Sequence, residues 1–262
     1  MTGNREWFEE FFDDLYYDTY TLFESEERNE REARFIAEAL DLPEGSRVLD
    51  LGCGYARHAV YLAKMGFEVV CFDLSDYMLS KARKRIEDFK VADRVIVVKG
   101  DMRRLDYTGE FDATYMFFTT FGYFSDEENR EVIHRVSRAL KPGGRLLIDL
   151  QNPVRLLSNI YLGRGEWKTW FEAGDYIVLE ETIYDLREAR IKSKRIFIDR
   201  RENCKVAERN LQIRTYMLWE LEQLLVEASL ETEKVYGDYK LGEYGPASPR
   251  MVVVAAKRLE VP

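Results

Sequence analysis

A strand, a tight glycine turn and the start of a helix constrain the fold of this chain most. The apolar run Val48–Leu51 contains Asp50, glycines follow at 52 and 54, and a helical pattern begins after His58. Glycines at alternate positions let the backbone turn sharply and approach a ligand at the N-terminus of the next helix. The pattern therefore predicts a nucleotide-type binding site at the end of the first strand of an α/β sheet.

The charge beside this turn indicates which ligand fits. A dinucleotide fingerprint needs a further glycine at position 57, where this chain has Arg57. The Asp50 carboxylate would also repel a pyrophosphate, whereas it would attract a ligand that carries a sulfonium and an ammonium group. The turn thus favours a cationic nucleoside over a dinucleotide.

A second carboxylate lies at the expected distance along the chain. The run Glu68–Phe72 reads as a buried strand, and Asp73 closes it. A carboxylate roughly twenty residues beyond such glycines can accept two hydrogen bonds from a ribose diol. The alternative is that Asp73 only caps the following helix, because Asp73-Leu74-Ser75-Asp76 also resembles a helix start.

Composition excludes several other classes. The formal net charge of −9 disfavours a nucleic-acid partner, because phosphate binding draws on clustered Lys and Arg. The three cysteines and two histidines are too few and too scattered for a disulfide framework or a metal site, so no metal is expected. No stretch approaches the length of a membrane span, and we expect a cytoplasmic protein without membrane contact. Charged residues make up 33% of the chain and Gln occurs only at 151, 212 and 223, which favours a thermophilic source.

Strands and helices alternate through the middle of the chain. Strands are predicted at 47–51, 68–72, 94–98, 111–118 and 145–149, with helices at 59–65, 74–89 and 126–140. Alternation of this kind predicts a parallel sheet with helices on both faces. Aromatic residues at helical spacing predict a further helix over 4–23, followed by one over 26–40.

The pattern changes after the fifth strand. Apolar and charged residues alternate in the runs 176–184, 190–198 and 206–215. This alternation predicts an antiparallel meander with one solvent-exposed face and one packed face. A helix at 218–230 and two strands at 232–236 and 251–257 follow, and the two strands should form an antiparallel hairpin at the sheet edge.

The motif over 48–58 resembles the first motif of class I S-adenosylmethionine (SAM)-dependent methyltransferases. Further phrases resemble a small-molecule subgroup of that family: Glu27-Arg28-Asn29 with Glu32, Arg57-His58, Asp101-Met102-Arg103, Phe121-Gly122-Tyr123-Phe124 and Ser248-Pro249-Arg250. One departure is Ala56, which stands where the family often has a third glycine and which we expect to exclude a positive φ.

The resemblance implies a Rossmann-like, doubly wound sheet of seven strands in the order 3-2-1-4-5-7-6, with strand 7 antiparallel. It also implies three parts. These are an N-terminal helical lid at 1–42, a SAM-binding core at 43–152 and 217–262, and an antiparallel β insertion at 153–216 that covers the substrate site. A homodimer is a further expectation.

The resemblance also implies a set of cofactor contacts. Asp50, Gly52 and Gly54 should surround the methionine part of SAM, and Asp73 should hold the ribose. The expected adenine contacts are Leu74, Met78, Asp101 and Met102. Phe118 should lie near the transferred methyl group, with Tyr20 and Arg28 at the methionine carboxylate. For each of these except the glycines and Asp73, an ordinary packing or surface role is the competing interpretation.

Methyl transfer from a sulfonium is an in-line displacement that mainly needs alignment and the exclusion of water. A general base is needed only where the acceptor must lose a proton, and Tyr20, Tyr123 and His58 are the candidates. Arg214 and Tyr216, at the end of the meander, are candidate contacts to the acceptor together with Tyr123. An equally supported interpretation is that Arg214 pairs with an acidic neighbour.

The sequence therefore predicts an enzyme that transfers a methyl group from SAM to N or O of a small molecule, leaving S-adenosylhomocysteine. Two alternatives remain open at this stage. One is a non-catalytic regulator that binds SAM or a nucleoside, and the other is a nicotinamide-dependent oxidoreductase, which needs the glycine that Arg57 replaces.

Overall fold

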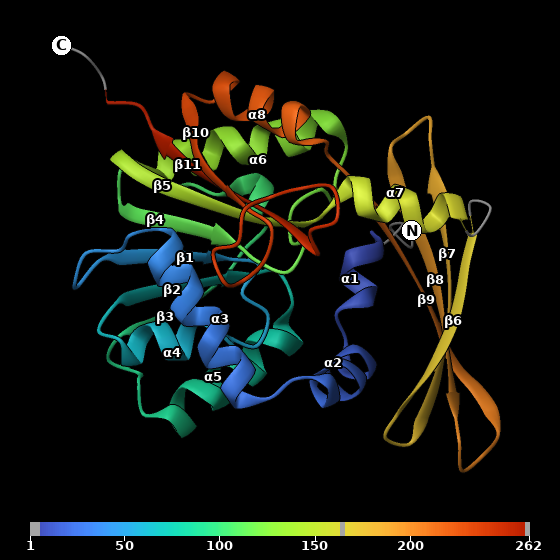
Figure 1. The fold of residues 1–262 in the computed structure, drawn as a ribbon. Coiled ribbons are helices and arrows are strands. Elements are labelled where there is room, and N and C mark those ends of the chain that lie inside the picture. Colours follow the sequence, from blue (N-terminus) through green and yellow to red (C-terminus); the bar gives the residue numbers. More distant parts are fainter. Residues whose placement is uncertain (1–5, 163–165, 260–262) are drawn as a thin grey trace, which may run out of the picture.

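A seven-stranded sheet forms the centre of the molecule (Figure 1). The computed structural model describes residues 6–162 and 166–259. The strands lie in the order β10-β11-β5-β4-β1-β2-β3. Their bounds are β1 Arg47–Leu51, β2 Glu68–Asp73, β3 Val95–Lys99, β4 Phe111–Met116, β5 Leu140–Gln151, β10 Leu230–Tyr236 and β11 Arg250–Lys257. Neighbours among β1 to β5 are parallel, whereas β11 is antiparallel to both β5 and β10. The predicted strand order, including the antiparallel seventh strand, is confirmed.

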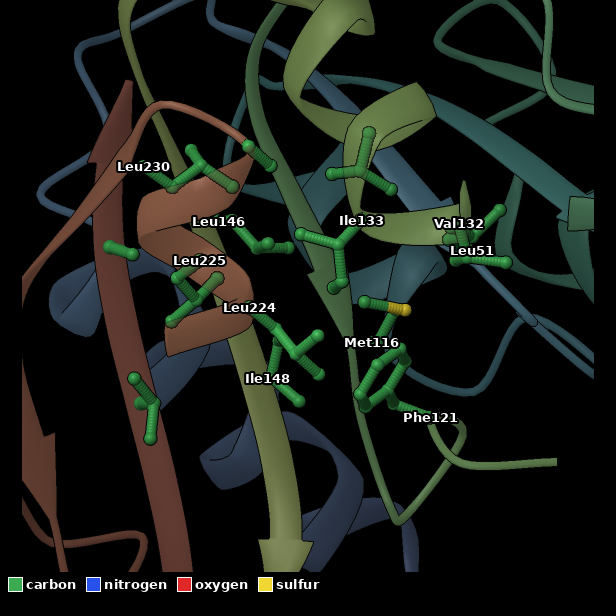
Figure 2. Close-up of a cluster of buried hydrophobic side chains, with 14 of the residues drawn as sticks. Leu51, Met116, Phe121, Val132, Ile133, Leu146, Ile148, Leu224, Leu225 and Leu230 are labelled. Atoms are coloured by element: carbon green, nitrogen blue, oxygen red, sulfur yellow. The ribbon is translucent and has the colours of Figure 1, made fainter. Parts of the chain in front are cut away.

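Helices cover both faces of this sheet, because its strands carry apolar side chains on alternate sides. Val48 of β1 packs on the side of α3 (Glu26–Ala39), α4 (Ala59–Lys64) and α5 (Asp76–Phe89). Leu49 and Leu51 pack on the other side, towards α6 (Asp126–Ala139) and α8 (Leu218–Glu227). Figure 2 shows that second core. Its labelled members are Leu51, Met116, Phe121, Val132, Ile133, Leu146, Ile148, Leu224, Leu225 and Leu230.

A separate antiparallel sheet follows β5. Helix α7 (Pro153–Leu162) leads into β6 (Glu166–Ala173), β7 (Tyr176–Asp185), β8 (Arg190–Asp199) and β9 (Cys204–Arg214), which pair in sequence order. The sequence predicted three of these strands but neither α7 nor β6. Strand β6 was not predicted because Trp170 and Phe171 are adjacent, so its apolar residues do not alternate with polar ones.

The N-terminal segment lies between the two sheets (Figure 1). It forms α1 (Trp7–Phe11), α2 (Asp14–Tyr20) and a 3₁₀ turn, η1 (Thr21–Phe23), rather than the single predicted helix. The break falls at Asp13, whose backbone is extended and whose Oδ1 accepts a hydrogen bond from the Tyr16 N–H at 3.0 Å. An aspartate N-cap of this kind begins a new helix and so ends the first. The start of the predicted helix, Asn4, lies outside the described residues.

The loop between β10 and β11 is fixed to the end of β5. The Asn152 side chain is buried and donates to the carbonyl oxygens of Gly245 and Ser248, both at 2.9 Å. It also accepts from the Tyr244 hydroxyl at 3.0 Å. The loop is therefore held beside the carboxyl ends of the parallel strands. Across the described part of the chain, no helix combines the length and the apolar character that crossing a membrane requires.

Candidate functional site

A cavity of about 580 Å³ lies at the carboxyl ends of the parallel strands. Its walls come from the glycine turn after β1, the segments after β2 and β3, the loop after β4, and the helices α1 and α2. Ligands of open α/β sheets bind at this edge. The sequence-predicted residues that line it are Asp50, Gly52, Gly54, His58, Asp73, Leu74, Met78, Asp101, Met102, Phe118 and Tyr123. The structure therefore brings most of the predicted cofactor residues together.

The glycine turn has the conformation that its sequence requires. Gly52 and Gly54 adopt φ of +77° and +54°. A Cβ at Gly52 would clash with the Thr120 Cγ2, whereas a Cβ at Gly54 would meet nothing within 4 Å. Gly54 lines the cavity, so this open space is available to a ligand. Ala56 corrects an expectation, because it adopts a φ of +61° instead of excluding positive values.

Two carboxylates line the cavity, Asp50 buried and Asp73 partly buried. Asp73 accepts hydrogen bonds from the Gly54 N–H at 2.9 Å and the Ser75 N–H at 2.8 Å. Burial raises the pKa of Asp73. The interpretation of Asp73 as a helix cap is wrong, because the N-cap of α5 is Ser75. Burial, and then the charge of Asp73, raises the pKa of Asp50 to about 7. A positively charged ligand would favour the ionised form of both groups.

Asp101, which also lines the cavity, already accepts hydrogen bonds from a neighbouring side chain. Its carboxylate accepts from the Arg103 Nε at 3.1 and 3.0 Å and from the Arg103 Nη2 at 2.7 Å. Burial raises the pKa of Asp101, but hydrogen bonds from Arg103 outweigh it and leave the pKa below its usual range. Asp101 is therefore an ionised acceptor, with Met102 beside it in the wall.

Aromatic side chains form another part of the cavity wall. Phe8, Phe12 and Tyr16 from α1, α2 and their junction line the cavity with Tyr123. The Tyr123 ring centroid lies 4.9 Å from that of Trp7 and 5.9 Å from that of Phe12. Burial raises the pKa of the Tyr123 hydroxyl. This shift is opposite to the one that a general base needs.

Tyr20 and Arg28 lie close to the cavity but outside its lining. The Tyr20 ring stacks on Tyr16 at 4.7 Å and lies 4.9 Å from the Arg195 guanidinium. The hydroxyl of Tyr20 is buried without a hydrogen-bond partner among the described residues, and burial raises its pKa. Arg28 donates from Nε to the Glu32 Oε1 at 2.8 Å.

Arg214 and Tyr216 lie at another place, where β9 meets α8. Arg214 pairs with Glu220 at 2.8 Å and with Asp126 at 3.3 Å. Tyr216 is buried, and its ring stacks on Phe121 at 5.2 Å. Neither residue lines the cavity. For Arg214 the geometry matches the alternative interpretation, in which it pairs with acidic neighbours.

A buried ionic network behind the glycine turn was not predicted as a unit. The His58 Nε2 and the Glu32 Oε2 are 2.9 Å apart, and the Arg57 Nη1 lies 3.1 Å from the same oxygen and 3.1 Å from the Asn29 Oδ1. Burial, and then the charge of Arg57, lowers the pKa of His58 to about 4. His58 is therefore a neutral and weak base at pH 7. The phrases containing Asn29, Glu32 and Arg57 were the only signal for this network.

The turn after β4 is the second feature that sequence reasoning missed. Phe118 and Thr119 adopt φ of +60° and +64°, although neither is a glycine. Asp149, fully buried in β5, accepts from the Phe118 N–H at 2.7 Å and from two nitrogens of Arg250 at 2.8 and 2.9 Å. The phrase ending in Arg250 is visible in the sequence, but the partner of Arg250, Asp149, is 101 residues away.

Comparisons with known proteins agree on the family. Residues 48–144 match a family described as "Methyltransferase domain". The chain is 25% identical to "Putative methyltransferase YqeM" of Bacillus subtilis, over 82% of this chain and 86% of that protein. It is 30% identical to the dTDP-3-amino-3,4,6-trideoxy-alpha-D-glucopyranose N,N-dimethyltransferase of Streptomyces venezuelae over 44% of this chain, and it spans half of that protein's length, 50%.

A solved structure extends the likeness to the whole fold. The CcbJ methyltransferase from Streptomyces caelestis superposes with a TM-score of 0.77 at 22% identity. The superposition covers 88% of this chain and 89% of CcbJ. Because it covers most of this chain, the likeness extends well beyond the segment that matches the family.

Proposed function

Because the chain is a class I SAM-dependent methyltransferase, we propose that it methylates a nitrogen or oxygen atom of a small-molecule acceptor. The observation that carries this proposal is the cavity in which the buried Asp50 and the partly buried Asp73 flank the open space at Gly54. Two carboxylates in such a cavity match a cationic nucleoside with a ribose diol. The relative from Streptomyces venezuelae, an N,N-dimethyltransferase of an amino sugar by name, supports nitrogen as one acceptor atom.

The residues at the cavity fit SAM in a definite order. Asp73 would hold the ribose, and Asp50 with the glycine turn would hold the methionine end. The proposed adenine contacts are Leu74, Met78, Asp101 and Met102. When bound, SAM would supply a methyl group bonded to a sulfonium sulfur. That sulfur is a good leaving group, because it departs as the neutral thioether of S-adenosylhomocysteine. Phe118 is the proposed neighbour of that methyl group, and Tyr20 and Arg28 would have to move to reach the ligand.

The protein's own part in the reaction is positioning and shielding. Phe8, Phe12 and Tyr16 cover the cavity and exclude water, which strengthens the interactions of Asp50 inside it. Tyr123 would orient the acceptor from the aromatic wall. The lowered pKa of His58 makes it a weak base, and the raised pKa of Tyr123 keeps its hydroxyl protonated, so neither accepts a proton readily at pH 7. We therefore propose that an amine acceptor enters uncharged.

The test is a product search. The protein is incubated with SAM labelled in the methyl group and a mixture of small amines, amino sugars and hydroxylated metabolites, and the products are separated and counted. A labelled small molecule supports the proposal. Tight SAM binding with no labelled product from any acceptor class would instead support the non-catalytic regulator. A homodimer, a cytoplasmic location and the absence of a nucleic-acid partner stay predictions.

A further inference from the structure

A fully buried tyrosine lies behind the Asp50 carboxylate. Strand β1 pairs with β4 on one side and with β2 on the other, and the register aligns Asp50 with Tyr115 and with Cys71. Side chains of aligned residues on neighbouring strands point to the same face of a sheet. Asp50 lines the cavity, whereas Tyr115 is fully buried and does not line it. The fold therefore places a phenol on the protein side of this carboxylate.

The Tyr115 hydroxyl is poised to donate a hydrogen bond. It has no hydrogen-bond partner of good geometry among the described residues. A buried tyrosine hydroxyl usually has a partner, because an unpaired one costs free energy, and a phenylalanine would fill the same space without that cost. Burial raises the pKa of Asp50, and the Tyr115 hydroxyl counteracts this rise, so the two groups already interact. The carboxylate of Asp50 is thus the acceptor available to this hydroxyl.

Other titratable groups also face Asp50. Asp73 of β2 raises the pKa of Asp50, and Arg57 of the glycine turn lowers it. Burial raises the pKa of the Cys53 thiol. A hydrogen bond with Cys53 lowers the pKa of Cys71, but burial and the neighbouring carboxylates outweigh it, so both thiols are neutral. Because thiols are weak donors, the phenol is the stronger neutral donor beside Asp50.

We propose that Tyr115 is a positioning residue, whose hydroxyl donates to the Asp50 carboxylate and so aims the other carboxylate oxygen at the ammonium group of the bound cofactor. A carboxylate held from behind loses less orientational freedom when the ligand arrives. The donor also favours the ionised form, which a cationic ligand needs. The inference rests on the proposed function, because it requires a ligand with an ammonium group at Asp50.

The first test removes the donor with Tyr115→Phe and follows S-adenosylhomocysteine binding by calorimetry across pH 6 to 8.5. Without the donor, the Asp50 carboxyl should keep its proton up to a pH about one unit higher. Affinity at pH 7 should therefore fall about three- to tenfold, and the ratio between wild type and variant should shrink towards pH 8.5. A merely structural defect would weaken binding by the same factor at every pH.

A second ligand tests whether the effect passes through the ammonium group. The desamino analogue of S-adenosylhomocysteine lacks only that group, and Tyr115→Phe should bind it no more weakly than the wild type does. In a double-mutant cycle, Asp50→Asn should remove most of the effect of Tyr115→Phe. Tyr61→Phe is the matched control. Tyr61 of α4 is also buried and donates its hydroxyl to a carboxylate, that of Glu26 at 2.5 Å, but neither residue lines the cavity.

If Tyr115→Phe does not fold, 3-fluorotyrosine in place of Tyr115 serves as the second variant. Its hydroxyl is a stronger donor, so the pH dependence of S-adenosylhomocysteine affinity should move to lower pH, and an unmoved profile would overturn the inference. Equal affinities of wild type and Tyr115→Phe at every pH, or an equal loss at every pH and for both ligands, would also overturn it.

The proposed reaction fails in a different way. Normal S-adenosylhomocysteine binding without any methylated product would count against the reaction and leave the role of Tyr115 intact. A wild type that binds no S-adenosylhomocysteine would overturn both.

Discussion

Asp73 is the residue on which cofactor affinity should depend most. Its carboxylate orders the turn by accepting from the Gly54 and Ser75 N–H groups, and its position in the cavity wall suits a ribose diol. We expect Asp73→Ala to weaken S-adenosylhomocysteine binding about a hundredfold, on the order of 2–3 kcal/mol, because these donors and the ribose hydroxyls lose their acceptor. Titration calorimetry measures this. Asp88→Ala, an exposed change on the helix that follows, α5, is the control, and equal affinities of the two variants would refute the assignment.

Asp50 should make ligand binding depend on pH. In the ligand-free protein its pKa is about 7, because burial and the charge of Asp73 disfavour the carboxylate. The ligand's ammonium group favours the ionised form, so binding releases a proton below pH 7. Affinity for S-adenosylhomocysteine should therefore rise between pH 6 and 7, by at most about tenfold per unit, and level off above.

Calorimetry at pH 6, 7 and 8, in two buffers of different ionisation enthalpy, measures both the affinity and the released proton. Asp50→Asn should bind more weakly and lose the pH dependence. A wild-type affinity that is the same at pH 6 and 8 would show that Asp50 does not titrate with the ligand.

At the scale of elements, one ion pair links the N-terminal helices to the second sheet. Asp13 caps α2 and also accepts from Arg209 of β9, with Nη2 at 2.6 Å and Nε at 2.9 Å. We expect Arg209→Gln to raise the dissociation rate of S-adenosylhomocysteine about three- to tenfold, because the cover over the cavity opens more often.

Stopped-flow displacement measures this rate. Lys205→Gln is the matched control, since Lys205 lies on the same strand and its partner Glu208 is a strand neighbour rather than part of a helix. If both variants release the ligand equally fast, α2 is not the element that limits release.

Much of the element pattern could be predicted from the sequence, because local periodicity decides it. Buried parallel strands such as β1 and β2 are apolar runs with a carboxylate at or next to their last residue, and both were predicted within one residue of their observed bounds. The division of the N-terminal segment was missed because an aspartate at position 13 reads equally well inside a helix or as a cap. The hydrogen bond that Asp13 accepts from the Tyr16 N–H identifies it as a cap.

The candidate site was predictable where one short segment supplies it, and not where distant segments meet. Gly52, Gly54 and Asp50 are close in sequence, so their arrangement follows from one turn. The Arg57–Glu32 and Arg250–Asp149 pairs join residues far apart in the chain, and no local pattern encodes which cation meets which anion. Tyr216, predicted as a contact to the acceptor, is buried against Phe121, and its place at the end of a strand does not reveal that burial.

At the scale of the whole molecule, α1 and α2 are packed on both sides. Towards the seven-stranded core they contact Tyr123, and towards the second sheet Phe11 lies 4.9 Å from the Arg195 guanidinium. Figure 1 shows these helices between the two sheets. The inner face of the second sheet, where Val178 and Phe197 are buried, therefore depends on them for cover.

Removing the residues before Glu26 should separate the two halves of the molecule. The core keeps its own apolar clusters on both faces of the seven-stranded sheet, so we expect it to stay folded. The second sheet loses its cover, and each apolar side chain exposed costs roughly 25 cal/mol per Å². The truncated protein should bind S-adenosylhomocysteine more weakly by at least about tenfold, because the aromatic wall of the cavity is gone.

Circular dichroism checks the core, limited trypsin digestion reports on the second sheet, and calorimetry gives the affinity. Full affinity together with a protease-resistant sheet would show that α1 and α2 neither cover the cavity nor support the sheet.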